Sequence, residues 1–368
     1  MATAAVKPRS RQQPISWARI ILAVVVLYAI LLFGPIAGLD IPRIARDIAA
    51  NPSLLVQQLI VGITNGAIIA IVALGYTLVY GIIELINFAN ADVFMLGGFM
   101  ALSIIGNMGV TANSSAGLKI AGLVLAFVGA GLLGAVLNWT IERFAYKPLR
   151  NAPRLAPLIS AIGVSFMLQN IGLIWGGLRP FFPIMGLNAA SPKSMPEVLP
   201  RIPLLPASSG IEFGTKDLIV VVTALVLWVA LRLFIQYTTL GKAMRATAQN
   251  RDASKIVGIH VDRVIAVTFL IGGALAGAAG CLVGFYNNTI VFTMGFTFGL
   301  RSFTAAVLGG IGNVTGAALG GVLIGVVAAF SDQYLSSRWT NAWIFTILII
   351  ILIFRPLGLL GEAAGEKA

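Results

Sequence analysis

Polar side chains interrupt one long apolar stretch of the sequence, GYTLVYGIIELINFANADVFMLGG at residues 75–98. They are Glu84, Asn87, Asn90 and Asp92. A charged side chain near the centre of a bilayer costs about 2.5–3.5 kcal/mol on insertion scales, and such residues usually face a bundle interior or a water-filled pathway. One interpretation of the cluster is therefore the lining of a solute pathway.

The spacing of these residues indicates an interruption of the helix. Glu84 and Asn87 are three residues apart and share one helix face, whereas Asp92 lies about 80° away from Glu84 around an ideal helix. No single helical stripe holds the cluster, and glycines at positions 81, 97 and 98 flank it and permit a bend. We predict a broken helix or a tight polar hairpin near residues 81–92.

A structural interpretation remains open beside the functional one. Asn and Asp are favoured residues at helix N-termini, so the cluster also suits a cytoplasmic turn that caps the next helix. Two polar residues of the preceding apolar run, Asn65 and Tyr76, are candidates for interhelical hydrogen bonds. We include them with the cluster as candidate residues of the pathway.

The composition identifies the environment in which these residues must be positioned. Of the 368 residues, 58% are hydrophobic and only 10% are charged, against about 25% charged residues in soluble domains, so lipid must surround the chain. The net charge of +12 does not indicate a nucleic-acid partner, because Lys and Arg fall in a few clusters between apolar runs. A single cysteine, Cys281, excludes an internal disulfide, and a single histidine, His260, excludes a His-rich metal site.

Apolar runs long enough to cross a bilayer predict an all-α, polytopic membrane protein with about ten transmembrane helices. The runs lie at about 17–39, 54–80, 93–109, 117–141, 155–178, 218–237, 264–286, 290–310, 314–330 and 341–355. Lys and Arg concentrate in residues 1–19, 142–154 and 232–263, which the positive-inside rule assigns to the cytoplasm. The first two basic stretches lie on the same side, so an even number of crossings separates them. The runs 17–39 and 117–141 supply one crossing each, and residues 54–109 must then cross the bilayer twice.

We therefore predict a single transmembrane permease domain at residues 17–361, in the inner membrane of the cell. Cytoplasmic tails at 1–16 and 362–368 flank it, so both termini are predicted to be cytoplasmic. Residues 179–217 are rich in proline and nearly balanced in charge, which is typical of an external loop. The glycines of GGALAGAAG at 272–280 predict helices that pack closely.

The stretch YTTLGKAMRATAQNRDASKIVGIHVDR at residues 237–263 is basic and holds few apolar residues. Asp252 is a candidate cap for a short helix that runs to Val257, and Gly258 can end that helix in a left-handed turn. Such a helix lies on anionic lipid or fits a groove of a soluble partner. The sequence has no G-x-x-x-x-G-K-[ST] loop that would bind phosphate. A pump of this kind needs a separate ATPase, and this stretch is the candidate docking segment.

Four blocks of the sequence, in this order and spacing, resemble the permease subunits of ATP-binding-cassette importers for branched-chain amino acids. That family also includes urea and short-amide permeases. The blocks are residues 75–98, RATAQNRDASKIVGIHVDRV (245–264), SFTAAVLGGIGNVTGAALGGVLIG (302–325) and FRPLGLLG (354–361).

The resemblance implies a pore made of two such permeases, identical or different. It also implies two ATPase subunits on the cytoplasmic face and an external solute-binding protein. The residues that would contact the ATPase are Arg245, Arg251, Asp252 and Gly258. ATP would be used by these partners, so the resemblance implies no cofactor in this chain and a transport subunit rather than an enzyme.

One position departs from the family pattern. After INFA the family commonly has His-Gly-acid, whereas this chain has Asn90-Ala91-Asp92. The change removes a titratable group and a flexible glycine. It argues against a proton-linked role at this position, and it weakens the assignment of which solute is carried. Two alternatives remain. A self-contained ion-coupled transporter would have only Glu84, Asp92 and Arg301 for a relay, and a membrane enzyme would have few catalytic groups with one Cys and one His.

Overall fold

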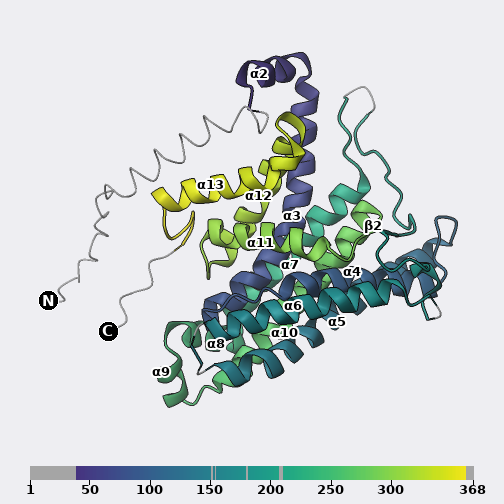
Figure 1. The fold of residues 1–368 in the computed structure, drawn as a ribbon. Helices are drawn as coiled ribbons and strands as arrows, with labels where there is room; N and C mark the ends of the chain where they lie inside the picture. The colour runs from purple at the N-terminus through teal and green to yellow at the C-terminus, as the bar shows by residue number, and fades with distance from the viewer. Residues whose placement is uncertain (1–38, 151, 154, 180, 207–209, 362–368) are drawn as a thin grey trace.

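Figure 1 shows a bundle of long helices in the computed structural model, which describes residues 39–150, 152–153, 155–179, 181–206 and 210–361. In these residues the fold is all-helical apart from two strands of two residues each. The predicted tails, and the predicted first span except for its last residue, lie outside the described residues.

The elements follow one another along the chain with short connections, except for the long segment between α6 and α7. In order they are α2 (Ile41–Ala50), α3 (Pro52–Ile83), α4 (Asn90–Asn107), α5 (Ala116–Ile141), η1 (Glu142–Tyr146), η2 (Lys147–Leu149), α6 (Leu155–Gly176), η3 (Pro183–Met185), β1 (Lys193–Ser194), α7 (Thr215–Tyr237), α8 (Thr239–Gln249), α9 (Arg251–Ile256), α10 (Val261–Asn287), β2 (Thr289–Ile290), α11 (Met294–Gly309), α12 (Val314–Tyr334), η5 (Ser337–Trp339) and α13 (Thr340–Phe354).

Seven helical segments among the described residues are long and apolar enough to cross a bilayer. They are Pro52–Ile83, Ala116–Leu149, Leu155–Gly176, Thr215–Tyr237, Val261–Asn287, Val314–Tyr334 and Ser337–Phe354. This confirms a multi-pass membrane protein, but it does not confirm the predicted count of ten. Two predicted spans fall short: α4 has 18 residues and begins with two polar ones among its first three. Helix α11 has 16 residues, about 24 Å against a hydrocarbon core of about 30 Å.

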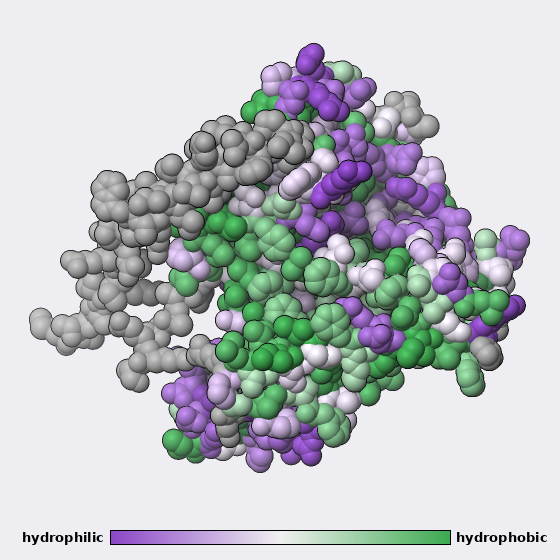
Figure 2. Space-filling model, viewed as in Figure 1, coloured by the Kyte–Doolittle hydropathy of each residue, from purple (hydrophilic) through white to green (hydrophobic). Residues whose placement is uncertain are grey.

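The surface is divided in the way that a bilayer requires. Figure 2 shows a hydrophobic band across the molecule, with hydrophilic groups around α2 at one end and around α8 and α9 at the other. Large apolar side chains are exposed on α5, α6 and α7, among them Leu132, Phe166 and Leu225. Lipid is the solvent in which these side chains are stable.

Helix α10 lies at the centre of the bundle and packs against α3, α4 and α5. A Cβ built on Gly280 would lie 1.8 Å from the carbonyl oxygen of Phe94, and one built on Gly134 would lie 2.2 Å from that of Gly273. Only glycine lets the backbones approach so closely at these positions. The close packing predicted from residues 272–280 is confirmed.

The glycines at positions 97 and 98 do not act as the predicted bend. Both lie inside the regular helix α4. A Cβ built on Gly97 would lie 2.5 Å from the carbonyl oxygen of Gly277 in α10. These residues therefore serve helix contact, as in α10 itself, and the bend prediction is wrong for them.

Six residues, 84–89, connect α3 to α4. Glu84 has φ +53°, a left-handed conformation that is uncommon for a residue other than glycine. Helix α3 packs mainly on α12 and α10, whereas α4 packs mainly on α10 and α5. The two helices diverge after the connection, so the structure does not confirm the predicted hairpin.

The segment between α6 and α7, predicted as an external loop, packs as a cap over one end of the bundle. Strand β1 pairs antiparallel with β2, so that Lys193 lies opposite Ile290. Met195 is buried. The Lys193 ammonium donates a hydrogen bond to the carbonyl oxygen of Asn188 at 2.5 Å, and burial lowers the pKa of this amine.

Candidate functional site

Three asparagines form a hydrogen-bonded chain, which we call the asparagine network: Asn87, Asn90 and Asn138. Nδ2 of Asn87 donates to Oδ1 of Asn138 at 3.0 Å, and Nδ2 of Asn138 donates to Oδ1 of Asn90 at 2.9 Å. The Tyr146 hydroxyl donates to the carbonyl oxygen of Ile86 and lies 3.3 Å from Oδ1 of Asn87. All three asparagines are at most 1% exposed. The amides bond one another where no water is available, and among the described residues Nδ2 of Asn90 has no hydrogen-bond partner.

The asparagine network lies at about half the depth of the bundle. Asn138 precedes Leu149, the end of its continuous helical segment, by about 16 Å of helix rise. Gly273 lies against Asn138 and follows Val261, the start of α10, by about 18 Å of helix rise. Both distances are roughly half of a hydrocarbon core of about 30 Å. Asn138 is also one helical turn before Glu142, and Asn87 follows the exposed Glu84 by three residues, so the network borders the charged groups at this end of the bundle.

Asp92 contacts α6 and α11 rather than the residues of the asparagine network. Ser165 of α6 donates a hydrogen bond to Oδ2 of Asp92, and Gln169, one turn further along α6, lies beside the carboxylate. Among the described residues, no hydrogen bond of ordinary geometry reaches Oδ1. A Cβ built on Gly295, in the first turn of α11, would lie 2.8 Å from Oδ1. The carboxylate is 1% exposed, with one oxygen bonded and the other directed at the start of α11.

The structure brings together only part of the predicted pathway set. Tyr76 is buried beside α11, where a Cβ built on Gly299 would lie 3.3 Å from the Tyr76 hydroxyl. Asn65 precedes Tyr76 by about 16 Å along α3 and is half-buried. Glu84 is exposed at the end of α3. Asn65 and Glu84 therefore lie apart from the buried polar groups.

Three residues of the site were missed from the sequence: Asn138, Tyr146 and Ser165. Asn138 is an isolated amide near the end of the apolar run 117–141, which is itself a signal because polar groups inside spans are costly. Tyr146 and Ser165 carry no such signal, because tyrosine and serine are common near the ends and at the packed faces of membrane helices. Their importance appears only once α5 and α6 are seen beside α4.

A second polar region lies at the C-terminal end of α3, next to the connection that carries Asn87. Glu84 borders a polar cavity of about 430 Å³ between the end of α3, the start of α6 and the α8–α9 segment. Arg150 lines the same cavity, and its guanidinium pairs with both Glu142 and Asp262. Lys147 pairs with Asp262 at 2.9 Å. We call Glu142, Lys147, Arg150 and Asp262 the charged rim.

Arg251 joins the α8–α9 segment to α3. Its Nη2 and Nε donate to the carbonyl oxygen of Ile82 at 2.9 and 3.3 Å. A carbonyl in the last turn of a helix has no intrahelical donor, so the guanidinium serves as a cap for α3. Arg245 does the same for α7, donating to the carbonyl oxygen of Ile235 at 2.6 Å.

The short helix α9 begins differently from the prediction. The N-cap is Asn250 and not Asp252, because the Asn250 side chain accepts from the backbone N–H groups of Asp252 and Ala253 at 3.0 Å each. Asp252 is exposed and pairs with Lys255 at 3.1 Å. Gly258 has φ +85°, which confirms the left-handed turn after the helix.

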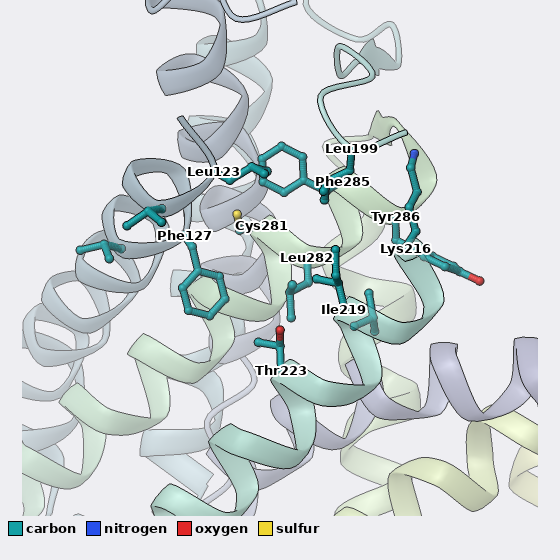
Figure 3. A pocket seen from close by; sticks show the side chains of 13 residues that line it. Leu123, Phe127, Leu199, Lys216, Ile219, Thr223, Cys281, Leu282, Phe285 and Tyr286 are labelled. Atoms are coloured by element: carbon teal, nitrogen blue, oxygen red, sulfur yellow. The ribbon is translucent and has the colours of Figure 1, made fainter. Parts of the chain in front are cut away.

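An apolar cavity of about 250 Å³ lies between α5, α7 and α10 and contains none of the predicted site residues. Figure 3 shows Phe127, Cys281 and Phe285 at its wall, with Lys216 and Tyr286 at one edge. A wall of this composition suits hydrocarbon better than a polar solute. Among the described residues, no group of three or more His, Cys, Asp or Glu side chains could hold a metal ion.

The comparisons with known proteins decide the family. The family model described as "Branched-chain amino acid transport system / permease component" matches residues 58–353. The chain belongs to this family. The match covers both the asparagine network and the α8–α9 segment, so both are parts of the permease domain. No solved structure matches the chain at a significant level.

Curated relatives cover most of this permease. The high-affinity branched-chain amino acid transport system permease protein LivH of Salmonella typhimurium is 37% identical over 84% of this chain and 97% of its own length. BraD of Pseudomonas aeruginosa, with the same description, is 38% identical over the same shares. The nucleoside ABC transporter permease protein NupB of Lactococcus lactis is 25% identical over 68% of this chain and 76% of its own length. These relatives favour a transport subunit of an ATP-driven system over the ion-coupled and enzymatic alternatives.

Proposed function

We propose that this permease forms the solute pathway of an ATP-driven importer for branched-chain amino acids or closely related small polar solutes. The high identity to LivH and BraD over nearly their whole length supports the solute class. The more distant NupB is named for a nucleoside, so the solute differs between branches of such permeases and must be tested directly.

The proposed assembly contains partners that this chain lacks. A second permease subunit, identical or different, would complete the pore. Two ATPase subunits would bind on the cytoplasmic side at α8 and α9, and an external protein would deliver the solute. In this arrangement both termini and the charged rim face the cytoplasm, in agreement with the distribution of Lys and Arg.

Within the chain, the pathway is proposed to run beside α4, past Asn87, Asn90, Asp92 and Tyr76. Glu84 would lie at the cytoplasmic mouth, since it borders the polar cavity at the end of α3. Asn65 would lie further toward the external side on α3. Polar residues at membrane depth commonly mark such pathways.

The observation that carries the proposal is the contact between Arg251 and Ile82. Arg251 is the first residue of α9, and Ile82 is the next-to-last residue of α3, two positions before Glu84. A movement of α9 imposed by an ATPase would therefore act directly on the connection that leads to the asparagine network. Arg245, Arg251, Asp252 and Gly258 are the residues we assign to this coupling.

Co-purification of the ATPase tests the docking segment. The double charge reversal Arg251→Glu with Asp252→Arg is expected to abolish recovery of the ATPase with the permease, because it inverts the charge pattern of α9. The matched control is Arg43→Glu with Asp47→Arg, which inverts an exposed ion pair on α2 and should leave recovery unchanged. Equal recovery from both variants would remove α9 from the interface.

Asn87→Leu tests the pathway beside α4. This substitution leaves Oδ1 of Asn138 without its donor and removes a polar group at mid-depth. Uptake into proteoliposomes should fall by about tenfold or more, while the amount of inserted protein stays the same. Normal uptake by this variant would show that Asn87 has only a structural role.

A further inference from the structure

Asp92 holds an arrangement that the asparagine network does not explain. Its Oδ1 is buried and faces Gly295 in the first turn of α11. Gln169 lies beside the carboxylate, but among the described residues no hydrogen bond of ordinary geometry reaches Oδ1. The other oxygen is bound by Ser165. A buried carboxylate with an unpaired oxygen is destabilising unless something compensates it.

Helix α11 presents the complementary charge to this oxygen. It begins at Met294, and the buried Gly295 of its first turn lies against Ala91 and Asp92, while Thr293 and Phe296 on the other side are exposed. The first N–H groups of a helix lack intrahelical acceptors, and the helix dipole makes this end partially positive. The N–H of Met294 already donates to the carbonyl oxygen of Val291 at 3.0 Å. The N–H groups that follow it in the first turn lie next to the carboxylate, on the side of Gly295.

The present conformation leaves no room for a ligand between them. A Cβ built on Gly295 would lie 2.8 Å from Oδ1 of Asp92, and one built on Gly299 would lie 2.2 Å from the Cβ of Ala91. These two glycines give α11 a smooth face against α4. A shift of α11 away from α4 exposes the acceptor and the donors together, one on each side of the opening.

We propose that Asp92 and the N-terminus of α11 form a recognition site for a zwitterionic solute when α11 moves away from α4. The solute ammonium binds Oδ1 of Asp92, and the solute carboxylate binds the N–H groups of the first turn of α11. This proposal rests on the proposed function and adds the solute chemistry to it. The site recognises the ammonium and the carboxylate, which every α-amino acid has. Selection among amino acids by their side chains depends on other contacts.

The chemistry predicts a particular selectivity. A 2-hydroxy acid keeps the carboxylate but has no ammonium, so it leaves Oδ1 unpaired. An amine without a carboxylate leaves the α11 donors unpaired. Each loss of a charge-assisted hydrogen bond weakens binding by about tenfold or more, so both analogues should bind at least that much more weakly than leucine.

The test uses the assembled transporter without the external binding protein, so that delivery does not determine the result. Binding of leucine is measured by saturation-transfer difference NMR, which detects weak ligands, with the 2-hydroxy analogue and the decarboxylated amine as competitors. Wild type should bind leucine saturably, and both competitors should be at least about tenfold weaker. The Asp92→Asn variant should bind leucine at least about tenfold more weakly and lose its preference over the 2-hydroxy analogue.

Two further variants make the result decisive. Asp332→Asn changes a carboxylate near the end of α12 that is bound by Thr340, and should leave leucine binding unchanged. Asp92→Glu keeps the charge and should keep the preference for leucine over the 2-hydroxy analogue, even if Asp92→Asn fails to assemble. Equal binding of leucine and the 2-hydroxy analogue in wild type, or no saturable binding at all, would overturn the site. Loss of ATPase docking in the α9 variants is independent of this readout, so the proposed function and the site fail separately.

Discussion

The asparagine network and the charged rim are both polar, but their polar groups are stabilised in different ways. The network consists of neutral amides, each at most 1% exposed and bonded within the group. The charged rim consists of paired acidic and basic side chains, of which Arg150 lines a polar cavity. Its side chains range from 3% exposed at Glu142 to 61% exposed at Asp262. Glu142 is as buried as Asn138, one helical turn away, and it is paired with Arg150, because an ion without a partner costs more than an amide where water is absent.

This contrast assigns the two regions different mechanical roles. Mutually bonded, buried amides fix the relative position of α4 and α5, whereas the pairs of the exposed Asp262 can exchange partners at little cost. Movement driven by an ATPase is therefore expected to enter at the rim and at α9. This movement should pass through the end of α3 and displace α11 rather than break the asparagine network.

The largest expected effect is the difference in folding between a substitution inside the bundle and one on its lipid-facing surface. Gly280→Leu places a side chain where even a Cβ meets the Phe94 carbonyl oxygen at 1.8 Å, and should prevent folding, at a cost of at least about 3 kcal/mol. Gly163→Leu, on α6, meets nothing within 4 Å and should fold normally. Size-exclusion chromatography in detergent measures the folded fraction. Similar profiles for both variants would contradict the tight packing of α10.

The next largest effect is a loss of stability when the asparagine network is broken. Asn138→Leu leaves Nδ2 of Asn87 and Oδ1 of Asn90 unpaired, at about 1–3 kcal/mol for each group. The midpoint of heat-induced aggregation should fall clearly. Thr140→Val is the control on the same helix, because Thr140 is half-buried and bonds to the carbonyl oxygen of Val136 in its own helix. A midpoint equal to that of the control would show that the network contributes no stability.

The link between the two regions should affect transport more than stability. Arg251→Met removes the cap on Ile82 and should lower uptake by about tenfold while the protein remains folded. Arg245→Met removes the corresponding cap from α7, which does not lead into the network, and its effect on uptake should be smaller. Equal uptake by these two variants would break the proposed path through α3.

The smallest effect is expected at the charged rim. Asp262→Asn weakens the pairs with Lys147 and Arg150, but Arg150 keeps its pair with Glu142. An exposed pair of this kind contributes at most about 1 kcal/mol. The heat-induced midpoint should change far less than in Asn138→Leu. A change as large as that one would show that the rim is as rigid as the network.

The sequence predicted the elements better than it predicted which residues meet. Periodicity and glycine spacing are local, so the helices and the packing of α10 could be expected. The turn at Gly258 needs only one residue with positive φ, and it was predicted correctly. The start of α9 was not, because Asn250 and Asp252 are both good caps and only the backbone shows which one is used.

The candidate site depends on contacts between segments that are distant in the sequence. Asn87 and Asn138 are 51 residues apart, and no pattern in one sequence pairs them. Glu84 was grouped with the cluster because it lies near Asn87 in the chain. Its left-handed backbone turns the chain back into the bundle and leaves Glu84 at the rim.

The orientation of the α8–α9 segment tests the central claim most directly, because an ATPase can act on it only from the cytoplasm. Cys281 is replaced by alanine, and a single cysteine is introduced at Lys242 on α8 or at Glu212 between α6 and α7, both exposed. An impermeant thiol reagent should label the Lys242→Cys variant only in inverted vesicles and the Glu212→Cys variant only in intact cells. Labelling of the Lys242→Cys variant in intact cells would contradict the account.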